Sequence, residues 1–195
     1  MEKVIIGAGG FAREIKSALG LNDIKFFVDD LFIDEKNNIF GLSNLDIEKH
    51  IAIIAIGSPE EREKIKKRLP NNLEYFTYID RRAIILDKNI NIGKGSIICA
   101  GAVLTTNIKN EEHVIINLNV TIGHDTRIND FTTVSPGANI SGNCLIGKKN
   151  YIGSNSCIRE GISLCDNVIV GLNGAVTANI QESGIYIGIP AKIKG

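Results

Sequence analysis

Aliphatic side chains recur at every sixth residue over the C-terminal half of the chain. The positions of this series, all but one aliphatic, are Leu86, Ile92, Ile98, Leu104, Asn110, Ile116, Ile122, Ile128, Val134, Ile140, Ile146, Ile152, Ile158, Leu164, Val170 and Val176. A period of six is not a multiple of the 3.6-residue turn of an α-helix, so on a helix these side chains would spread around every face. Short strands that turn a corner every six residues keep them on one side, which predicts a parallel β-helix.

Two further positions of the hexad support this prediction. Four residues after each aliphatic position lies a second position that is usually small or β-branched, as at Ala102, Val120 and Ala138. Glycine recurs one residue after the aliphatic position, at Gly93, Gly123, Gly147, Gly153 and Gly171. Three hexads make one coil of a triangular β-helix, so residues 18 apart are expected to stack at about 4.8 Å.

Before the repeat, short apolar strands alternate with helical segments. Residues 3–6, 25–28, 51–56 and 74–79 have the apolar, β-branched character of strands. Helices are predicted over residues 11–19 and from residue 59, after a capping box at residues 58–61, to about residue 69. This alternation predicts a small parallel sheet, an α/β half-Rossmann domain.

The distribution of aromatic residues separates the two regions. Eight of the eleven Phe and Tyr residues lie at or before Tyr78. The narrow interior of a β-helix accommodates aliphatic side chains and not rings. We therefore expect two domains with separate cores, residues 1–80 and residues 81–195.

Charge and composition exclude several classes of protein. Lys plus Arg equals Asp plus Glu, at 22 each, so no basic surface for nucleic acid or for an anionic membrane is expected. The longest apolar run, residues 51–56, is far shorter than the roughly 20 residues of a membrane span. The first residues lack the pattern of a secretory signal peptide, and the four cysteines lack metal-ligand spacing. We expect a cytoplasmic protein with free thiols and no metal site.

The first predicted strand ends in a glycine turn, Gly7-Ala8-Gly9-Gly10, that leads into the first predicted helix. Glycines there let a phosphate approach backbone N–H groups at a helix N-terminus. Asp29 and Asp30 follow the second strand at the spacing of a ribose-binding acid. A complete NAD or FAD site needs two such halves, so the expected ligand is a nucleotide sugar. NAD binding and a purely structural turn are the alternatives.

One histidine of the repeat is placed to do chemistry. His124 occupies neither inward position of its hexad, and the residue one coil further on is Gly142. The missing side chain leaves a slot beside the imidazole and exposes a backbone N–H. Histidine suits a general base near neutral pH, and a fixed N–H suits a developing oxyanion. By contrast, His113 is expected to face solvent without a role, and two histidines on the repeat are too few for a zinc site of three.

Together these motifs resemble the PglD- and NeuD-like family of sialic-acid and amino-sugar acetyltransferases. The segments that carry the resemblance are the glycine turn, Ile122-Gly-His-Asp125, Val134-Ser-Pro-Gly-Ala138, Gly142-Asn143, Ile152-Gly-Ser-Asn-Ser156 and Gly188-Ile-Pro-Ala-Lys192. The resemblance covers the whole chain. It implies a left-handed β-helix, acetyl-CoA as co-substrate, and a homotrimer with the catalytic histidine in a cleft between subunits.

The resemblance also implies roles for individual residues. His124 would be the catalytic base, Asp125 its acidic support, and the Gly142 amide the donor to the thioester carbonyl. The residues that would bind the nucleotide sugar are Gly7, Gly9, Gly10, Asp29, Asp30 and Asn117. Those that would border acetyl-CoA are Gly142, Gly153, Gly171, Gly174, Pro190 and Lys192. Many relatives have histidine where this chain has Phe11, and some where it has Thr133, two departures that concern the acceptor.

The function expected from the sequence is N-acetylation of the 4-amino group of a UDP- or dTDP-linked amino-deoxysugar. The resemblance places this reaction in the synthesis of bacterial surface glycans such as lipopolysaccharide, or of glycoprotein sugars. An O-acetyltransferase acting on sialic acid or another sugar hydroxyl would use the same base and donor. A non-catalytic β-solenoid scaffold is an alternative of another class, but it should show regular rows of identical outward residues, which this chain lacks.

Several outward positions of the repeat are aliphatic. They are Ile97, Val103, Ile115, Leu145 and Ile169. Left exposed, such residues form apolar patches of the size that usually marks an interface. A triangular prism buries one wall per subunit most simply in a three-fold ring, so a homotrimer is expected.

Overall fold

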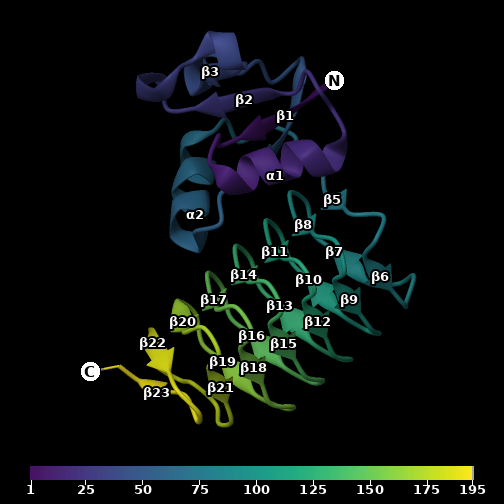
Figure 1. Ribbon diagram of the computed structural model, residues 1–195, viewed down its shortest axis with the longest axis vertical. Helices are drawn as coiled ribbons and strands as arrows, with labels where there is room; N and C mark the ends of the chain where they lie inside the picture. Colours follow the sequence, from purple (N-terminus) through teal and green to yellow (C-terminus); the bar gives the residue numbers. More distant parts are fainter. Residues whose placement is uncertain (195) are drawn as a thin grey trace. The chain divides into compact units, whose positions relative to one another are not determined.

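The computed structural model describes residues 1–194. The chain divides into two compact units, Met1–Thr77 and a second unit that begins at Tyr78 (Figure 1). Each unit has its own hydrophobic core. Within residues 1–194, no helix is long and apolar enough to cross a membrane.

The first unit is built on a parallel sheet with the strand order β3-β2-β1-β4. Its strands are β1 (Glu2–Ile6), β2 (Lys25–Val28), β3 (Ile39–Gly41) and β4 (His50–Ile54). Its helices are α1 (Gly10–Leu19) and α2 (Pro59–Arg68), with short 3₁₀ turns η1 (Asp30–Phe32), η2 (Glu35–Asn37) and η3 (Leu42–Asn44). Successive strands are added on one side of β1 as far as β3, and β4 is then added on the other side, so the chain changes direction across the sheet at β1 and β4. In such sheets ligands bind beyond the carboxyl ends of the strands at this point.

The predicted elements of this unit are largely present. The hydroxyl of Ser58 accepts a hydrogen bond from the N–H of Glu61 at 3.3 Å, as the capping box requires. The strand expected over residues 74–79 is divided between the two units. Tyr75 makes one bridge to Ala52, whereas Tyr78 already belongs to the second unit.

The second unit is the parallel β-helix that the six-residue repeat predicts, with the left-handed coil that the family resemblance implies. In the described part of the chain, its strands form three sheets, which are the walls of the coil. The first wall consists of β5 (Tyr78–Ile79), β8 (Ile97–Ile98), β11 (Ile115–Ile116), β14 (Thr133–Val134), β17 (Tyr151–Ile152), β20 (Val168–Val170), β22 (Gly184–Ile187) and β23 (Lys192–Ile193). The second consists of β6 (Ile84–Ile85), β9 (Val103–Leu104), β12 (Thr121–Ile122), β15 (Asn139–Ile140), β18 (Cys157–Ile158) and β21 (Ala175–Val176). The third consists of β7 (Asn91–Ile92), β10 (Lys109–Asn110), β13 (Arg127–Ile128), β16 (Leu145–Ile146) and β19 (Ser163–Leu164).

Stacking at 18 residues holds through the middle of the β-helix. Ile116 pairs with Ile98 on one side and with Val134 on the other. The aliphatic series from Ile98 to Val176 is buried, and the one polar member, Asn110, is also fully buried. The side-chain amide of Asn110 donates a hydrogen bond to the hydroxyl of Ser96 at 3.2 Å. This polar exception in the repeat therefore has a hydrogen-bond partner on another inward side chain.

The first coil differs from the predicted register by one residue. Leu104 pairs with Ile85 and not with Leu86, whereas Asn110 pairs with Ile92 at the regular spacing. The coil therefore contains one extra residue between β6 and β7. Leu86, predicted to be inward, is 66% exposed, so that prediction is wrong. A strict six-residue count places Leu86 inside because it cannot detect an insertion.

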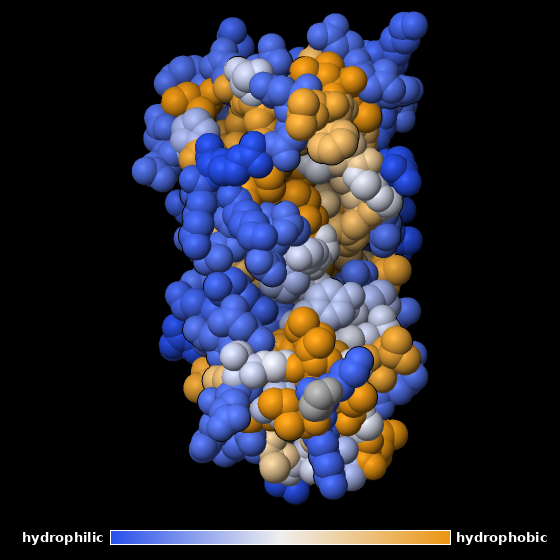
Figure 2. All heavy atoms as spheres, turned by 90° about the vertical axis from the view of Figure 1, so that its left-hand side faces the viewer, coloured by the Kyte–Doolittle hydropathy of each residue, from blue (hydrophilic) through white to orange (hydrophobic). Residues whose placement is uncertain are grey.

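The outward aliphatic residues do not form one exposed surface. Ile97 and Ile115 are buried within the chain itself, which contradicts the expectation that they are exposed. Leu145 and Ile169 are exposed at 45% and 41%. Further exposed apolar residues lie at the C-terminal end of this unit, and Figure 2 shows hydrophobic surface there: Leu172, Ile185, Ile187, Ile189 and Ile193.

Candidate active site

The corner that joins the second wall to the third has one left-handed residue in each of four successive coils. These residues are Asn107, Asp125, Asn143 and Gly161, with φ between 51° and 73°. Asn, Asp and Gly are the residues that tolerate this conformation best. We call this column of turns the His124 corner, because His124 immediately precedes Asp125. The side chain of His124 is 53% exposed there.

His124 and Asp125 form a hydrogen-bonded pair. The distance from His124 Nδ1 to Asp125 Oδ2 is 2.8 Å. A carboxylate only accepts hydrogen bonds, so Nδ1 carries the proton and Nε2 presents a lone pair. Hydrogen bonds from Asn107 and from His124 hold the pKa of Asp125 below its usual range, so its carboxylate stays charged near neutral pH. This arrangement is suited to a histidine that removes a proton through Nε2.

Gly142 lies against the imidazole one coil further on. A Cβ at this position would be 2.5 Å from His124 Nε2, so any side chain would displace the ring or cover it. Within residues 1–194, the Gly142 N–H donates to no acceptor. Gly142, with its unused backbone donor, therefore lies against Nε2 of the imidazole, as the stacking of positions 124 and 142 predicts.

Gly123 is a part of this site that the sequence analysis did not single out. A Cβ on Gly123 would collide with the backbone nitrogen of Gly142. Glycine at 123 thus keeps the Gly142 amide accessible. The repeated glycine of the hexad was the available signal, but it does not distinguish Gly123 from glycines that serve packing alone.

Packing accounts for the other glycines of the predicted acetyl-CoA site. A Cβ on Gly153 would lie 2.6 Å from the carbonyl oxygen of Val170, and one on Gly174 would lie 2.9 Å from that of Gly171. A Cβ on Gly171 would lie 2.8 Å from the side chain of Ile187. Pro190 precedes β23, and Lys192 is an exposed residue at its start. Their role toward acetyl-CoA stays a prediction.

The structure does not bring Asn117 to His124. Asn117 follows β11 and His124 follows β12, so strand β12 separates them in the coil. The side-chain oxygen of Asn117 accepts the N–H of Leu118 at 2.7 Å.

Of the two departures from the family pattern, Thr133 is buried on β14, and Phe11 is half-buried in the first turn of α1.

The glycine turn of the first unit contains two different kinds of glycine. Gly7 has a φ of +106°, and its N–H donates to Phe27, so the backbone requires glycine there. A Cβ on Gly9 would meet nothing within 4 Å, and one on Gly10 would meet only the end of Arg13. The fold itself does not need these two glycines, and they leave the N-terminus of α1 open to a ligand.

Asp29 and Asp30 line a different part of the first unit. Asp29 forms an ion pair with Arg68, the last residue of α2, and Asp30 accepts the N–H of Ser43 at 3.3 Å. Both acids line an open pocket of about 710 Å³, together with Arg68 and residues of η3. Ala8 of the glycine turn lines a separate pocket of about 480 Å³ with Arg13 and Lys16. The predicted nucleotide residues are therefore distributed over two neighbouring features.

His113 does not face solvent as predicted. It is 1% exposed, and its ring stacks on that of Phe131 with a centroid distance of 5.2 Å and an interplanar angle of 11°. The prediction was wrong because Phe131, one coil further on, covers the ring of His113, and the six-residue pattern does not show what covers an outward side chain.

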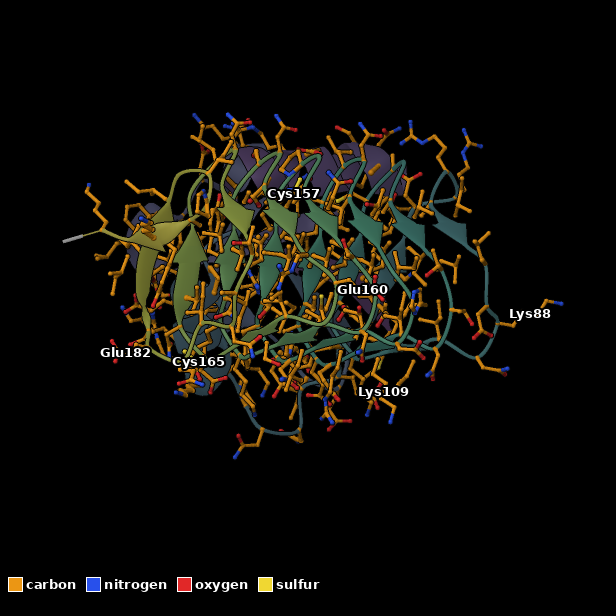
Figure 3. The ribbon with its side chains drawn as sticks, turned by 90° about the horizontal axis from the view of Figure 1, so that it is seen from below. Lys88, Lys109, Cys157, Glu160, Cys165 and Glu182 are labelled. Atoms are coloured by element: carbon orange, nitrogen blue, oxygen red, sulfur yellow. The ribbon has the colours of Figure 1, made fainter. Side chains whose placement is uncertain are left out.

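Cysteines and acids form no alternative site in the described chain. Within residues 1–194 none of the four cysteines forms a disulfide, and no group of three His, Cys, Asp or Glu could hold a metal ion. Cys157 is exposed, Cys165 is partly buried, and the two lie well apart in Figure 3. Burial raises the pKa of Cys144, which makes this thiol a poor nucleophile.

Comparisons with known proteins agree with this architecture. Residues 3–69 match the PglD N-terminal domain family. GDP-perosamine N-acetyltransferase from Escherichia coli O157:H7 is 28% identical over 174 residues, which cover 81% of this chain and 78% of that protein. The acetyltransferase domain of PglB from Neisseria gonorrhoeae FA1090 has a TM-score of 0.89 at 28% identity over 99% of both chains, and it has also been solved with acetyl coenzyme A. WeeI from Acinetobacter baumannii AYE has a TM-score of 0.88 at 25% identity over the full length of both chains.

Proposed function

We propose that this acetyltransferase transfers the acetyl group of acetyl-CoA to the amine of a nucleotide-linked amino sugar. The observation that carries this proposal is the position of Gly142, whose N–H has no acceptor within residues 1–194, against Nε2 of His124. The related PglB domain binds acetyl coenzyme A, and the E. coli relative is an N-acetyltransferase named for GDP-perosamine.

The proposed reaction uses these two groups in sequence. The sugar nitrogen attacks the thioester carbonyl carbon, and the new C–N bond forms while His124 Nε2 accepts a proton from the nitrogen. The carbonyl oxygen becomes an oxyanion that accepts the N–H of Gly142. Collapse of this intermediate breaks the C–S bond, and the thiolate of coenzyme A leaves with the proton from the imidazolium. Base and oxyanion donor each contribute a factor of roughly 10² or more in such reactions.

The charge of Asp125 supports the intermediate stage of this sequence. Its carboxylate lies 2.8 Å from His124 Nδ1 and therefore stabilises the imidazolium that forms when Nε2 takes the proton. Because the pKa of Asp125 is held low, this support persists at any pH at which the amine can be unprotonated.

We place the nucleotide on the first unit, at the open N-terminus of α1 and the pocket beside Asp29 and Asp30. The α1 N-terminus supplies N–H groups suited to a diphosphate. The pocket supplies carboxylates and Arg68, which suit the hydrogen-bonding edges of a ribose or base. The similarity to a GDP-sugar enzyme adds GDP to the UDP and dTDP sugars expected from the sequence.

The test is transfer of labelled acetyl from acetyl-CoA to a panel of GDP-, UDP- and dTDP-linked 4-amino sugars. Each amino sugar is paired with the sugar that carries a hydroxyl at the same carbon. We expect label on an amino sugar and none on its hydroxyl partner. Label only on hydroxyls or on sialic acid would establish O-acetylation instead, and no label on any acceptor would favour the scaffold.

We further propose a homotrimer in which acetyl-CoA and the amino sugar each contact two subunits. The exposed Leu145 and Ile169 support an interface on the β-helix. Three copies of the 21.2 kDa chain have a mass of about 64 kDa, which light scattering at micromolar protein concentration measures directly. A monomer that retains full activity would contradict both the trimer and the shared site.

A further inference from the structure

The Asp125 carboxylate is held from two sides, by residues of two different coils. Its Oδ2 atom is 2.8 Å from His124 Nδ1 in the same turn. Its Oδ1 atom accepts a hydrogen bond of 2.5 Å from the side-chain amide of Asn107, one coil earlier. With one oxygen bound by each partner, the carboxylate cannot rotate without breaking a hydrogen bond.

Asn107 is itself fixed from the coil before it. Its backbone N–H donates to Asp87 Oδ2 at 3.2 Å, and the hydroxyl of the adjacent Thr106 donates to the same oxygen at 3.0 Å. Backbone N–H groups of Asn89 and Asn107 and the Thr106 hydroxyl hold the pKa of Asp87 below its usual range, so this anchor stays charged. A chain of hydrogen bonds therefore runs from Asp87 through Asn107 and Asp125 to the imidazole.

We propose that Asn107 is a positioning residue for the acetyl transfer proposed above, acting on His124 through Asp125. Its amide fixes the plane of the carboxylate so that Oδ2 faces Nδ1. The proton then stays on Nδ1, and the Nε2 lone pair stays directed at the slot beside Gly142. A residue that holds the hydrogen-bond partner of a histidine in this way sets the tautomer and the orientation of its ring. This inference rests on the proposed function for its kinetic test only.

The amide of Asn107 suits this role better than a carboxylate would. An amide nitrogen donates a hydrogen bond and adds no charge, so it lowers the pKa of Asp125 without competing for the imidazole proton. A carboxylate at residue 107 would stand against Asp125, and two acids so close cannot both be ionised without repulsion.

The first test removes the side chain without disturbing the turn. Asn107 has a φ of 51°, which glycine adopts freely, so Asn107→Gly leaves the backbone intact. Asn167 is the matched control, because it has a φ of 60° at a different corner and an exposed side chain. We expect kcat to fall about 10-fold in Asn107→Gly while KM for both substrates changes less than about 2-fold. Asn167→Gly should retain the kcat of the native protein. Equal kcat values in the two variants would overturn the proposal. A fall in kcat accompanied by a comparable change in KM would also overturn it.

The second test uses pH to separate positioning from stability. In Asn107→Asp the new carboxyl shares a proton with Asp125, so its pKa is raised. Below that pKa it can donate to Asp125 as the native amide does, and above it the two carboxylates repel. We expect the ratio of mutant to native kcat to fall as the pH rises, with no such slope for Asn167→Asp. A loss that is the same at every pH would contradict the proposal.

The third test needs no substrate and so distinguishes this inference from the proposed function. The chain has only three histidines, so ¹⁵N spectra of histidine-labelled protein resolve each ring, and a His124→Asn variant assigns the signal. We expect the Nδ1–H tautomer at His124 in the native protein and a mixture of tautomers in Asn107→Gly. An unchanged tautomer would overturn the proposal even if acetyl transfer is established. A changed tautomer in a protein that acetylates no acceptor would support the positioning of His124 by Asn107 and contradict only the proposed reaction.

Discussion

The two histidines of the β-helix have opposite environments although their corners are built alike. His113 takes the left-handed position itself, whereas His124 immediately precedes the left-handed residue Asp125. The ring of His113 is buried against Phe131, and that of His124 is half exposed beside Gly142. In each case the residue 18 positions further on decides whether the imidazole is covered or open.

In this β-helix the exposure of a histidine depends on its place in the turn and on one stacked neighbour. Neither the residue type nor its presence on the repeat is sufficient. An aromatic neighbour buries the histidine ring in a packed contact, whereas a glycine neighbour leaves one ring nitrogen accessible to a substrate.

The largest effect is expected from removal of the exposed histidine. His124→Ala should lower kcat/KM at least about 10²-fold, as for loss of a general base, and should leave the Tm within a few degrees because the ring is half exposed. The measurement is acetyl transfer beside thermal unfolding, with His113→Asn as the control that should retain turnover. Near-native turnover in His124→Ala would mean that the exposed histidine is no more important for catalysis than the buried one.

A smaller loss is expected when the open corner is closed by a side chain. Gly142→Val places a Cβ within 2.5 Å of His124 Nε2, so the thioester can no longer reach its position between base and N–H. We expect the rate of acetyl transfer to fall roughly 10- to 100-fold, within the range of losing an oxyanion donor. Calorimetry should show nucleotide-sugar affinity changed less than about 3-fold, because we place the nucleotide on the other unit. A parallel loss of both would show that the change is merely structural.

The converse change concerns the packed corner. Asn adopts the left-handed conformation readily, so His113→Asn keeps the turn but removes the ring stacked on Phe131. We expect a loss of about 1–2 kcal/mol in the free energy of unfolding, measured by urea denaturation, with unchanged kcat. A stable protein with impaired catalysis would mean that the buried histidine has a chemical role after all.

The smallest effect is expected from the third histidine, His50 of the first unit. It is buried, its Nδ1 accepts the N–H of Asp46 at 3.1 Å, and burial holds its pKa below the usual 6.5 despite the nearby Glu2. The unfolded chain therefore binds this proton more readily than the folded one, so stability should decline as the pH falls below about 6.5. Urea denaturation between about pH 7.5 and 5.5 should show a shallower decline for His50→Gln. Identical slopes would exclude His50 as the cause.

Much of the β-helix could be predicted because its coils repeat one geometry. A single aliphatic position per hexad was enough to identify the interior from Ile98 to Val176. Leu86 was misplaced because one inserted residue changes the register without changing the composition. The burial of Ile97 and Ile115 could not be predicted, because the pattern gives the direction of a side chain and not what covers it.

The stacking rule also explains which parts of the candidate site were found. It predicts Gly142 beside His124, and the same spacing of 18 places Asn107 beside Asp125. The partner of Asp29 could not be found in this way. Arg68 comes from a helix 39 residues away, and no periodicity connects the two residues.

The uniform spacing of the coils also limits how this enzyme could change. Residues 106, 124, 142 and 160 occupy equivalent places on four successive coils, so a base with its glycine neighbour can move along the axis only in steps of about 4.8 Å. Insertion or deletion of 18 residues would shift the site by one such step and leave every turn intact. The distance between the proposed base and the bound acceptor can therefore change only by whole coil spacings. An acceptor of slightly different length must be accommodated by changes elsewhere in the chain.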